Sequence, residues 1–404
     1  MKISVSMLAL TAALGFATAA FADDKNVKLG VLTDMAGLYA DVGGAGSIVA
    51  AQMAVDDSGL AAKGWKIDIV SADHQNKPDV GVNISRQWAD QDKVDGIFDV
   101  LTSSVALAVA GVAKDKNLVY MNSGAAASDL TNSACTPNTV HWTYDTYLLA
   151  NGTGKAVVKS GGDTWFFLTA DYAFGQALER DTTAVITANG GKVLGSVRHP
   201  LSSSDFSSYL LQAQASKAKI IGLANAGGDT ANSIKQASEF GITAGGQKLA
   251  ALLLFITDVH SVGLKIAQGL QFTTTFYWDQ NDGTRAFAKR FAEKMKNHQM
   301  PTMVQAGVYA SVNHYLKTLA AMGANPHDGA KVVSKMKETP TEDALFGKGS
   351  IQANGRVIHP GYLFQVKTPE ESKGEWDLVK QIATIPADEA FTPIAQSTCA
   401  LLKK

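Results

Sequence analysis

The sequence has few cysteines, no excess of charge of either sign and, beyond its first residues, no long apolar run. Its 404 residues include two cysteines, and 36 lysines and arginines against 37 aspartates and glutamates give a net charge of −1. No basic stripe with interleaved aromatic residues is present, so nucleic acid is not an expected partner. The 46% hydrophobic and 18% charged residues are typical of a soluble globular protein.

Motifs of common catalytic and metal sites are also missing. No G-x-S-x-G, H-E-x-x-H or G-x-x-x-x-G-K-[ST] sequence occurs, and no two of the eight histidines are three or four residues apart. A glycine-rich loop at residues 43–46 lacks the third glycine and the tight turn of a dinucleotide site. We therefore expect no enzyme, no cofactor and no metal site. An exported hydrolase and a ligand sensor stay as remote alternatives.

The first 22 residues have the pattern of a secretory signal peptide. Lys2 precedes an apolar run from Ile3 to Ala19, and residues 20–22, Ala-Phe-Ala, form an A-x-A cleavage site. A membrane anchor is the alternative, because this stretch could nearly span a bilayer. Its Ser, Thr and Gly residues and the small-residue site favour cleavage, so we expect an exported protein.

Cys135 and Cys399 are far apart in the chain. In an exported protein an even pair of cysteines predicts a disulfide, with two free buried thiols as the alternative. Their spacing excludes a C-x-x-C redox or zinc site. The bridge would tie the end of the chain to a loop in its first half.

From residue 27 onward, short apolar runs rich in β-formers alternate with helical patterns. Such alternation predicts parallel sheets covered by helices on both faces. The expected strands are residues 27–32, 65–70, 95–101, 118–121, 164–168, 192–197, 218–223, 249–254 and 270–274. The helical patterns between them include residues 47–57, 80–91, 105–113, 148–158, 174–188, 206–215 and 230–240.

The expected fold class is α/β, with two doubly wound, Rossmann-like lobes joined by a hinge that the chain crosses more than once. The chain is too long for one ordinary core. The pattern restarts near residues 141–147, changes again at residues 276–282, and becomes hairpin-like beyond Gly347. We expect an N-terminal lobe of residues 23–143 plus 275–350 and a C-terminal lobe of residues 144–274 plus 351–404, with the tail tied back by the disulfide.

The most informative stretch is residues 96–129, which reads as strand, helix, strand and small-residue loop. Its two loops should open at one edge of a parallel sheet, where ligands of such sheets bind. Ser103 and Ser104 open the helix, and Ala125, Ala126 and Ala127 follow the second strand. Hydroxyl groups and free backbone N–H groups there suit a carboxylate or another small anion. The alternative is that these residues only cap the helix and pack tightly.

Further candidates follow other expected strands. Tyr144 lies in an aromatic segment between the lobes, where it could contact a ligand or pack the hinge. Tyr172 and Phe174 follow a strand of the second lobe and should face the cleft. Asn225 ends another strand. The helix that follows begins there, and its first backbone N–H groups could contact a ligand.

Several segments of the chain, taken in their order and spacing, resemble those of the periplasmic leucine/isoleucine/valine-binding type of solute receptor. The resemblance covers essentially all of the mature chain. It implies a type I binding-protein fold in the periplasm, which closes like a hinge on its ligand and delivers it to the membrane permease of an ATP-binding-cassette importer. The segments are residues 29–34, 39–44, 101–104, 123–127, 171–175 and 205–207.

The resemblance also implies roles for individual residues. Ser104 and the loop from Ala125 to Ala127 would hold the ligand carboxylate, although Ala127 replaces the usual Thr. Tyr172 or Phe174 would form an aromatic wall. Amino-acid binders place an acidic residue after the strand near Leu254, and Asp258 could take that place in an uncertain register.

Phe255 lies beside this position and suits a ring or an alkyl chain better than an ammonium group, because an unpaired buried ammonium is costly. The predicted ligand is a small carboxylate with an apolar or aromatic body, and a branched-chain or other amino acid is the alternative. The expected receptor is a monomer.

Overall fold

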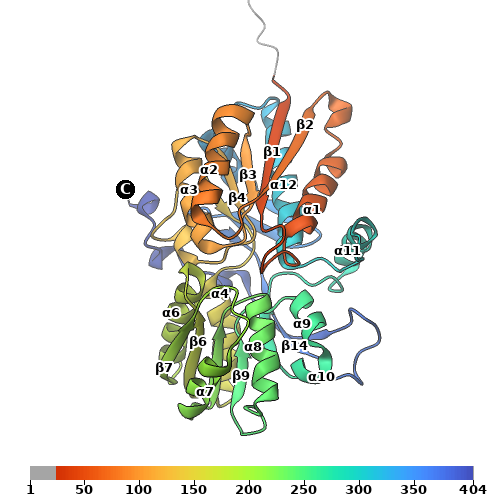
Figure 1. Ribbon diagram of the computed structural model, residues 1–404. Coiled ribbons are helices and arrows are strands. Elements are labelled where there is room, and N and C mark those ends of the chain that lie inside the picture. The colour runs from red at the N-terminus through yellow and green to blue at the C-terminus, as the bar shows by residue number, and fades with distance from the viewer. Residues whose placement is uncertain (1–23, 404) are drawn as a thin grey trace, which may run out of the picture.

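The computed structural model describes residues 24–403, so the predicted signal peptide lies outside the described residues. The protein has two lobes, each built on a parallel sheet (Figure 1). The two-lobed α/β fold class is confirmed.

The first lobe is organised around a five-stranded parallel sheet in the order β2-β1-β3-β4-β5. Helices α1 and α12 pack on one face through Val31 and Phe98, and helices α2 and α3 cover the other through Leu32 and Ile97. Its strands are β1 (Asn26–Thr33), β2 (Lys66–Asp73), β3 (Gly96–Asp99), β4 (Val119–Asn122) and β5 (Thr139–His141). Its helices are α1 (Gly44–Ser58), α2 (Pro78–Gln87), α3 (Ser103–Asp115), α11 (Asp282–Lys294), α12 (Met303–Met322) and α13 (Gly329–Glu338).

The second lobe has a four-stranded parallel sheet in the order β7-β6-β8-β9. Alternate residues of β6 point to opposite faces: Phe167 packs in one hydrophobic cluster with α6, and Leu168 in another with α7 and α8. Its strands are β6 (Thr164–Ala170), β7 (Lys192–His199), β8 (Ile220–Ala224) and β9 (Lys248–Ala251). Its helices are α4 (Thr146–Leu149), α5 (Lys155–Lys159), α6 (Ala173–Ala188), α7 (Ser207–Ala215), α8 (Gly228–Glu239), α9 (Ile256–Val262) and α10 (Leu264–Ala267).

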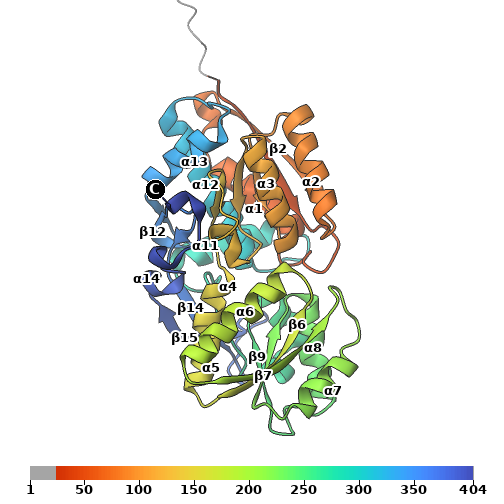
Figure 2. The same ribbon diagram turned by 90° about the vertical axis from the view of Figure 1, so that its left-hand side faces the viewer.

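Two small antiparallel sheets and the tail complete the fold. The chain crosses between the lobes at residues 142–145, 275–281 and 359–360, and the tail after β15 returns to the first lobe. Figure 2 shows β14, β15 and α14 stacked along one side of the molecule, beside the junction of the lobes. The elements are β10 (Gln271–Thr274), β14 (Gly361–Val366) and β15 (Val379–Ile385) in one sheet, β11 (Thr341–Asp343), β12 (Gly347–Ile351) and β13 (Val357–Ile358) in the other, and α14 (Ala387–Ala390). The division of the chain into the predicted lobe ranges stays a prediction.

The strand predicted over residues 249–254 ends earlier than expected. Strand β9 stops at Ala251, and Leu252, Leu253 and Leu254 continue as buried, irregular chain. All three are apolar because the segment runs between two hydrophobic clusters, with Leu253 in one and Leu254 in the other. An apolar run buried on all sides has no periodicity that marks the end of a strand.

The predicted disulfide between Cys135 and Cys399 is present, with its two Cα atoms 5.6 Å apart. It closes a loop over 264 residues of sequence and fixes the tail on the first lobe. Closing so long a loop removes much conformational freedom from the unfolded chain.

A double variant, Cys135→Ser with Cys399→Ser, is expected to lower the free energy of unfolding by roughly 2–5 kcal/mol, because the unfolded chain regains that freedom. Urea unfolding of both proteins, with and without reductant, measures the difference. Reductant should destabilise the wild type and leave the variant unchanged. If full reduction of the disulfide left the free energy of unfolding of the wild type unchanged, this account would be contradicted.

Candidate ligand-binding site

A narrow cavity, nearly closed in this structure, lies between the two lobes. Each lining residue comes from a segment that follows the carboxyl end of a parallel strand, as expected for ligand sites of such sheets. Among the described residues that line the cavity, none is charged. The lining is formed by Tyr39, Val42, Leu101, Gly124, Ala126, Tyr144, Tyr172, Phe174, Ala226, Leu253 and Phe255.

The loop after β1 brings Tyr39 to the cavity. The Asp34 carboxylate organises this loop, because it accepts the backbone N–H groups of Gly37 at 2.7 Å and Tyr39 at 2.9 Å. The Asn76 side-chain amide donates to the same carboxylate at 2.7 Å. Tyr39 is therefore held in place by a buried acid at the end of its own strand.

The loop after β4 is joined to the start of helix α3 by Ser103. The Ser103 hydroxyl oxygen accepts the backbone N–H groups of Ala126 at 3.3 Å and Ala127 at 3.2 Å. The Asn122 side chain braces the same loop, accepting from the Ala125 N–H at 3.1 Å and donating to the Ala125 carbonyl at 2.7 Å. Of the predicted anchor residues, only Ala126 lines the cavity. Ser103, Ala125 and Ala127 are buried behind it, and Ser104 is partly exposed.

Aromatic side chains form the wall on the side of the second lobe. Tyr172 precedes helix α6 and Phe174 lies in its first turn, while Phe255 precedes helix α9. The ring of Tyr144, from the first crossing, meets Phe255 edge to face with centroids 6.1 Å apart. The structure thus brings together the predicted residues Tyr144, Tyr172, Phe174 and Phe255 in one lining.

Phenol groups supply the polar side-chain atoms of the lining. The hydroxyl groups of Tyr39 and Tyr172 lie 2.6 Å apart, so one hydrogen bond joins the two lobes across the cleft. The Tyr144 hydroxyl donates to the Gly124 carbonyl at 2.7 Å. Burial raises the pKa of all three phenols, which therefore stay neutral near neutral pH.

Asp258 and Asn225 do not line the cavity. The Asp258 carboxylate accepts the backbone N–H of Phe255 at 2.9 Å and thereby caps helix α9, while burial raises the pKa of Asp258 to about 7. Asn225 is buried inside the second lobe, where it accepts from the Thr230 hydroxyl at 2.7 Å and donates to the Ser233 hydroxyl at 3.1 Å. Both side chains hold the loops that present the lining.

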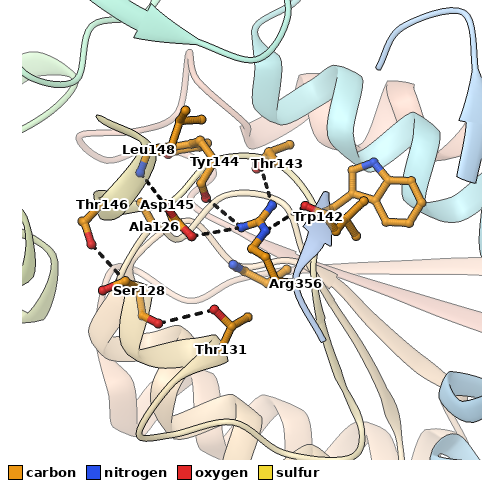
Figure 3. A network of polar contacts seen from close by, with 12 residues as sticks. Ala126, Ser128, Thr131, Trp142, Thr143, Tyr144, Asp145, Thr146, Leu148 and Arg356 are labelled. Atoms are coloured by element: carbon orange, nitrogen blue, oxygen red, sulfur yellow. Dashed lines mark hydrogen bonds and ion pairs between the residues drawn. The ribbon is translucent and has the colours of Figure 1, made fainter. Parts of the chain in front are cut away.

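The buried guanidinium group of Arg356 contacts the first crossing between the lobes, which includes Tyr144. Figure 3 shows Arg356 directed at the first crossing, where it donates to the backbone carbonyls of Thr143 and, at 3.4 Å, of Tyr144. Its Nη1 atom lies 3.7 Å from the Asp145 carboxylate, and its Cζ atom stacks 4.2 Å from the ring centroid of Phe391. The guanidinium thus links the first crossing to the tail that the disulfide fixes.

Burial dominates the electrostatics of this pair. It raises the pKa of Asp145 to about 6, although the neighbouring guanidinium opposes that rise. Burial likewise lowers the pKa of Arg356 to about 10. Each charge therefore depends on the other, because neither side chain reaches water.

The sequence profile of the periplasmic binding protein family matches residues 26–375. The chain belongs to this family. A periplasmic binding protein of Burkholderia mallei, whose structure is known, is 53% identical, with 94% of this chain and 100% of that chain covered and a TM-score of 0.90. Membership places the protein outside the cytoplasm, and among residues 24–403 no helix combines the length and apolar character needed to cross a bilayer.

Other similar proteins are named for different ligands. The structure of a branched-chain amino acid ABC transporter ligand-binding protein from Burkholderia xenovorans is 41% identical, with 93% of this chain and 99% of that chain covered and a TM-score of 0.82. Leu/Ile/Val-binding protein homolog 6 of Brucella melitensis is 24% identical over 345 residues, 82% of this chain and 85% of the relative. A solute-binding protein from R. palustris in complex with benzoate shares the fold, with 19% identity, 93% and 99% coverage and a TM-score of 0.81.

The hinge pair of this periplasmic binding protein gives a stability prediction. Arg356→Met should lower the free energy of unfolding by roughly 3–5 kcal/mol, because it leaves the Asp145 carboxylate buried without a cation. Urea unfolding measures the loss, and adding Asp145→Asn should recover part of it.

The matched control is Arg290→Met, which breaks the pair of Arg290 with Asp57 at 2.7 Å on the surface. That pair is solvated, so its loss should cost no more than about 1 kcal/mol. Equal effects of Arg356→Met and Arg290→Met would contradict the assigned role of the buried pair.

Proposed function

We propose that this substrate-binding protein of an ABC importer captures a small carboxylic acid with an apolar or aromatic body and passes it to a membrane permease. The observation that carries the proposal is the uncharged lining of the cavity. An amino acid presents an ammonium group that would need a buried anion as its partner. The acid expected to provide one, Asp258, caps helix α9 instead.

The carboxylate would lie against the N-terminal lobe. Ser104 and the first turn of helix α3 would offer hydroxyl and backbone N–H groups there, an arrangement that favours anions, while the Ser103 hydroxyl holds the loop from Ala125 to Ala127 beside them. The body of the ligand would then contact Tyr144, Phe174 and Phe255. Benzoate binding by the R. palustris protein of the same fold supports this class of ligand.

Binding would proceed by closure of the hinge without any covalent step. A ligand that contacts both lobes adds interactions that exist only in the closed form, so it shifts the population toward that form. The Tyr39–Tyr172 hydrogen bond joins the lobes at the same place. We expect the receptor to act as a monomer.

A branched-chain amino acid is the second candidate ligand. The relative from Burkholderia xenovorans, 41% identical, favours it. The apolar wall would accept a leucine or valine side chain as readily as a ring. The two candidates differ in whether the site has a partner for an ammonium group.

Calorimetric titration with benzoate-type and cinnamate-type acids beside leucine and valine separates the two. We expect the aromatic acids to bind tightly and the amino acids weakly, because the lining lacks an anionic partner. Tight binding of the amino acids alone would contradict the proposal.

Phe174→Ala should weaken binding of the aromatic acid roughly ten- to hundredfold, because it removes a buried aromatic surface worth about 1.5–3 kcal/mol. The control is Phe240→Ala, which removes the same ring where it is 43% exposed at the end of helix α8. If both variants bound the aromatic acid as tightly as the wild type, Phe174 would not contact the ligand.

A further inference from the structure

Strand β3 ends in an unusual backbone turn. Asp99 and Val100 are consecutive residues with positive φ angles of 77° and 61°. This conformation is uncommon for residues other than glycine, and for a β-branched residue such as Val100 it is an outlier. Strained backbone of this kind persists where the surrounding structure enforces it, and it is concentrated at functional sites. Here the turn places Leu101 in the cavity lining and the Asp99 carboxyl directly behind that lining.

The Asp99 carboxyl is completely buried, and within the described residues neither of its oxygens meets a donor in full hydrogen-bond geometry. Two glycines make room for it. A Cβ atom on Gly124 would lie 2.8 Å from Oδ1, and one on Gly43 would lie 3.0 Å from Oδ2. Gly124 lines the cavity, so the carboxyl is separated from the cavity by little more than the Gly124 backbone.

The groups around Asp99 offer no counter-charge. Thr33 of β1 and Ser47 of α1 present hydroxyl groups, which favour the ionised form. Tyr120 of β4 and Tyr144 of the first crossing are neutral phenols. Burial is the larger influence and raises the pKa of Asp99 to about 6.

We propose that Asp99 takes up a proton when a ligand carboxylate binds against the loop of residues 124–127. The inference rests on the proposed function, which places the ligand carboxylate on this loop. Two carboxylates held close together away from water cannot both stay ionised at little cost, so one of them binds a proton. The proton comes from solvent and stays on the Asp99 carboxyl, and the ligand remains an anion.

Proton uptake makes the affinity depend on pH. Below the pKa of free Asp99 the proton is already present and the affinity for the ligand is constant. Above it the protein must first bind a proton, so the affinity falls as pH rises, by up to roughly tenfold per pH unit. A neutral ligand of the same shape imposes no such requirement.

Calorimetric titration of the full-length mature protein with benzoate across the range from about pH 5 to about pH 8 tests the proposal. Repeating it in two buffers with different ionisation enthalpies counts the protons taken up and needs no variant. The wild type should bind benzoate more weakly above about pH 6, with net proton uptake. Asp99→Asn, checked for folding by its melting temperature, should bind with no pH slope and no proton uptake.

Asp229→Asn is a matched control, because burial raises the pKa of this carboxyl to about 7. It should keep the pH slope, and wild-type binding of benzamide should show none. The inference is overturned by a wild type without proton uptake, by a slope that persists in Asp99→Asn, or by a slope lost in Asp229→Asn.

If leucine or valine binds in place of benzoate, the proposed ligand class is wrong. The same titrations, carried out with the amino acid, then test proton uptake by Asp99 independently of the ligand class. Failure of every acid to bind would overturn both proposals.

Discussion

The site depends on one topological constraint: the parallel strands of both lobes end at the same gap. Loops that follow β1, β3, β4 and β5 meet loops that follow β6, β8 and β9, and these segments supply the whole described lining of the cavity. Each sheet alone exposes half of a site, and only their opposition encloses a ligand. The buried Arg356 guanidinium holds the first crossing, and the disulfide holds the tail on the first lobe.

Closure combines apolar burial with a few polar contacts between the lobes. One hydrophobic cluster extends from Phe98 in the first sheet through Tyr144 to Phe167 in the second. The ion pair of Arg180 with Asp129, at 3.1 Å, is partly exposed and adds little energy. Burial of the aromatic lining adds apolar contact between the lobes beside these polar contacts.

Much of the fold could be predicted because its signals are local. Runs such as residues 27–32 and 164–168 became strands β1 and β6, since buried parallel strands are apolar along their whole length. Tyr172 and Phe174 were expected to face the cleft because they follow a strand end, and both line the cavity. Tyr144, for which hinge packing was the alternative, and Phe255, which the family resemblance pointed to, line it as well. Ser103 was expected to offer its hydroxyl group to a ligand, but in the structure that hydroxyl accepts two backbone N–H groups.

Other parts depend on contacts between distant segments. Tyr39 lines the cavity because Asp34 orders its loop. Leu253 lines it because strand β9 ends early. Neither the role of Asp34 nor the early end of β9 can be recognised in the sequence. Asp258 was a candidate amine partner in an uncertain register, and it caps the helix that begins after Phe255, a residue type that does not mark a capping motif. Short strand β5 carries too few residues for a period to be recognised.

The central claim is that the ligand carboxylate lies against the N-terminal lobe and the ligand body against the aromatic wall. A crystal structure of the protein purified without refolding and soaked with benzoate tests it most directly. The account predicts density between the lobes, with the carboxylate beside residues 124–127 and the ring beside Phe174 and Phe255. A carboxylate pointing toward the second lobe, or benzoate bound outside this cavity, would contradict it.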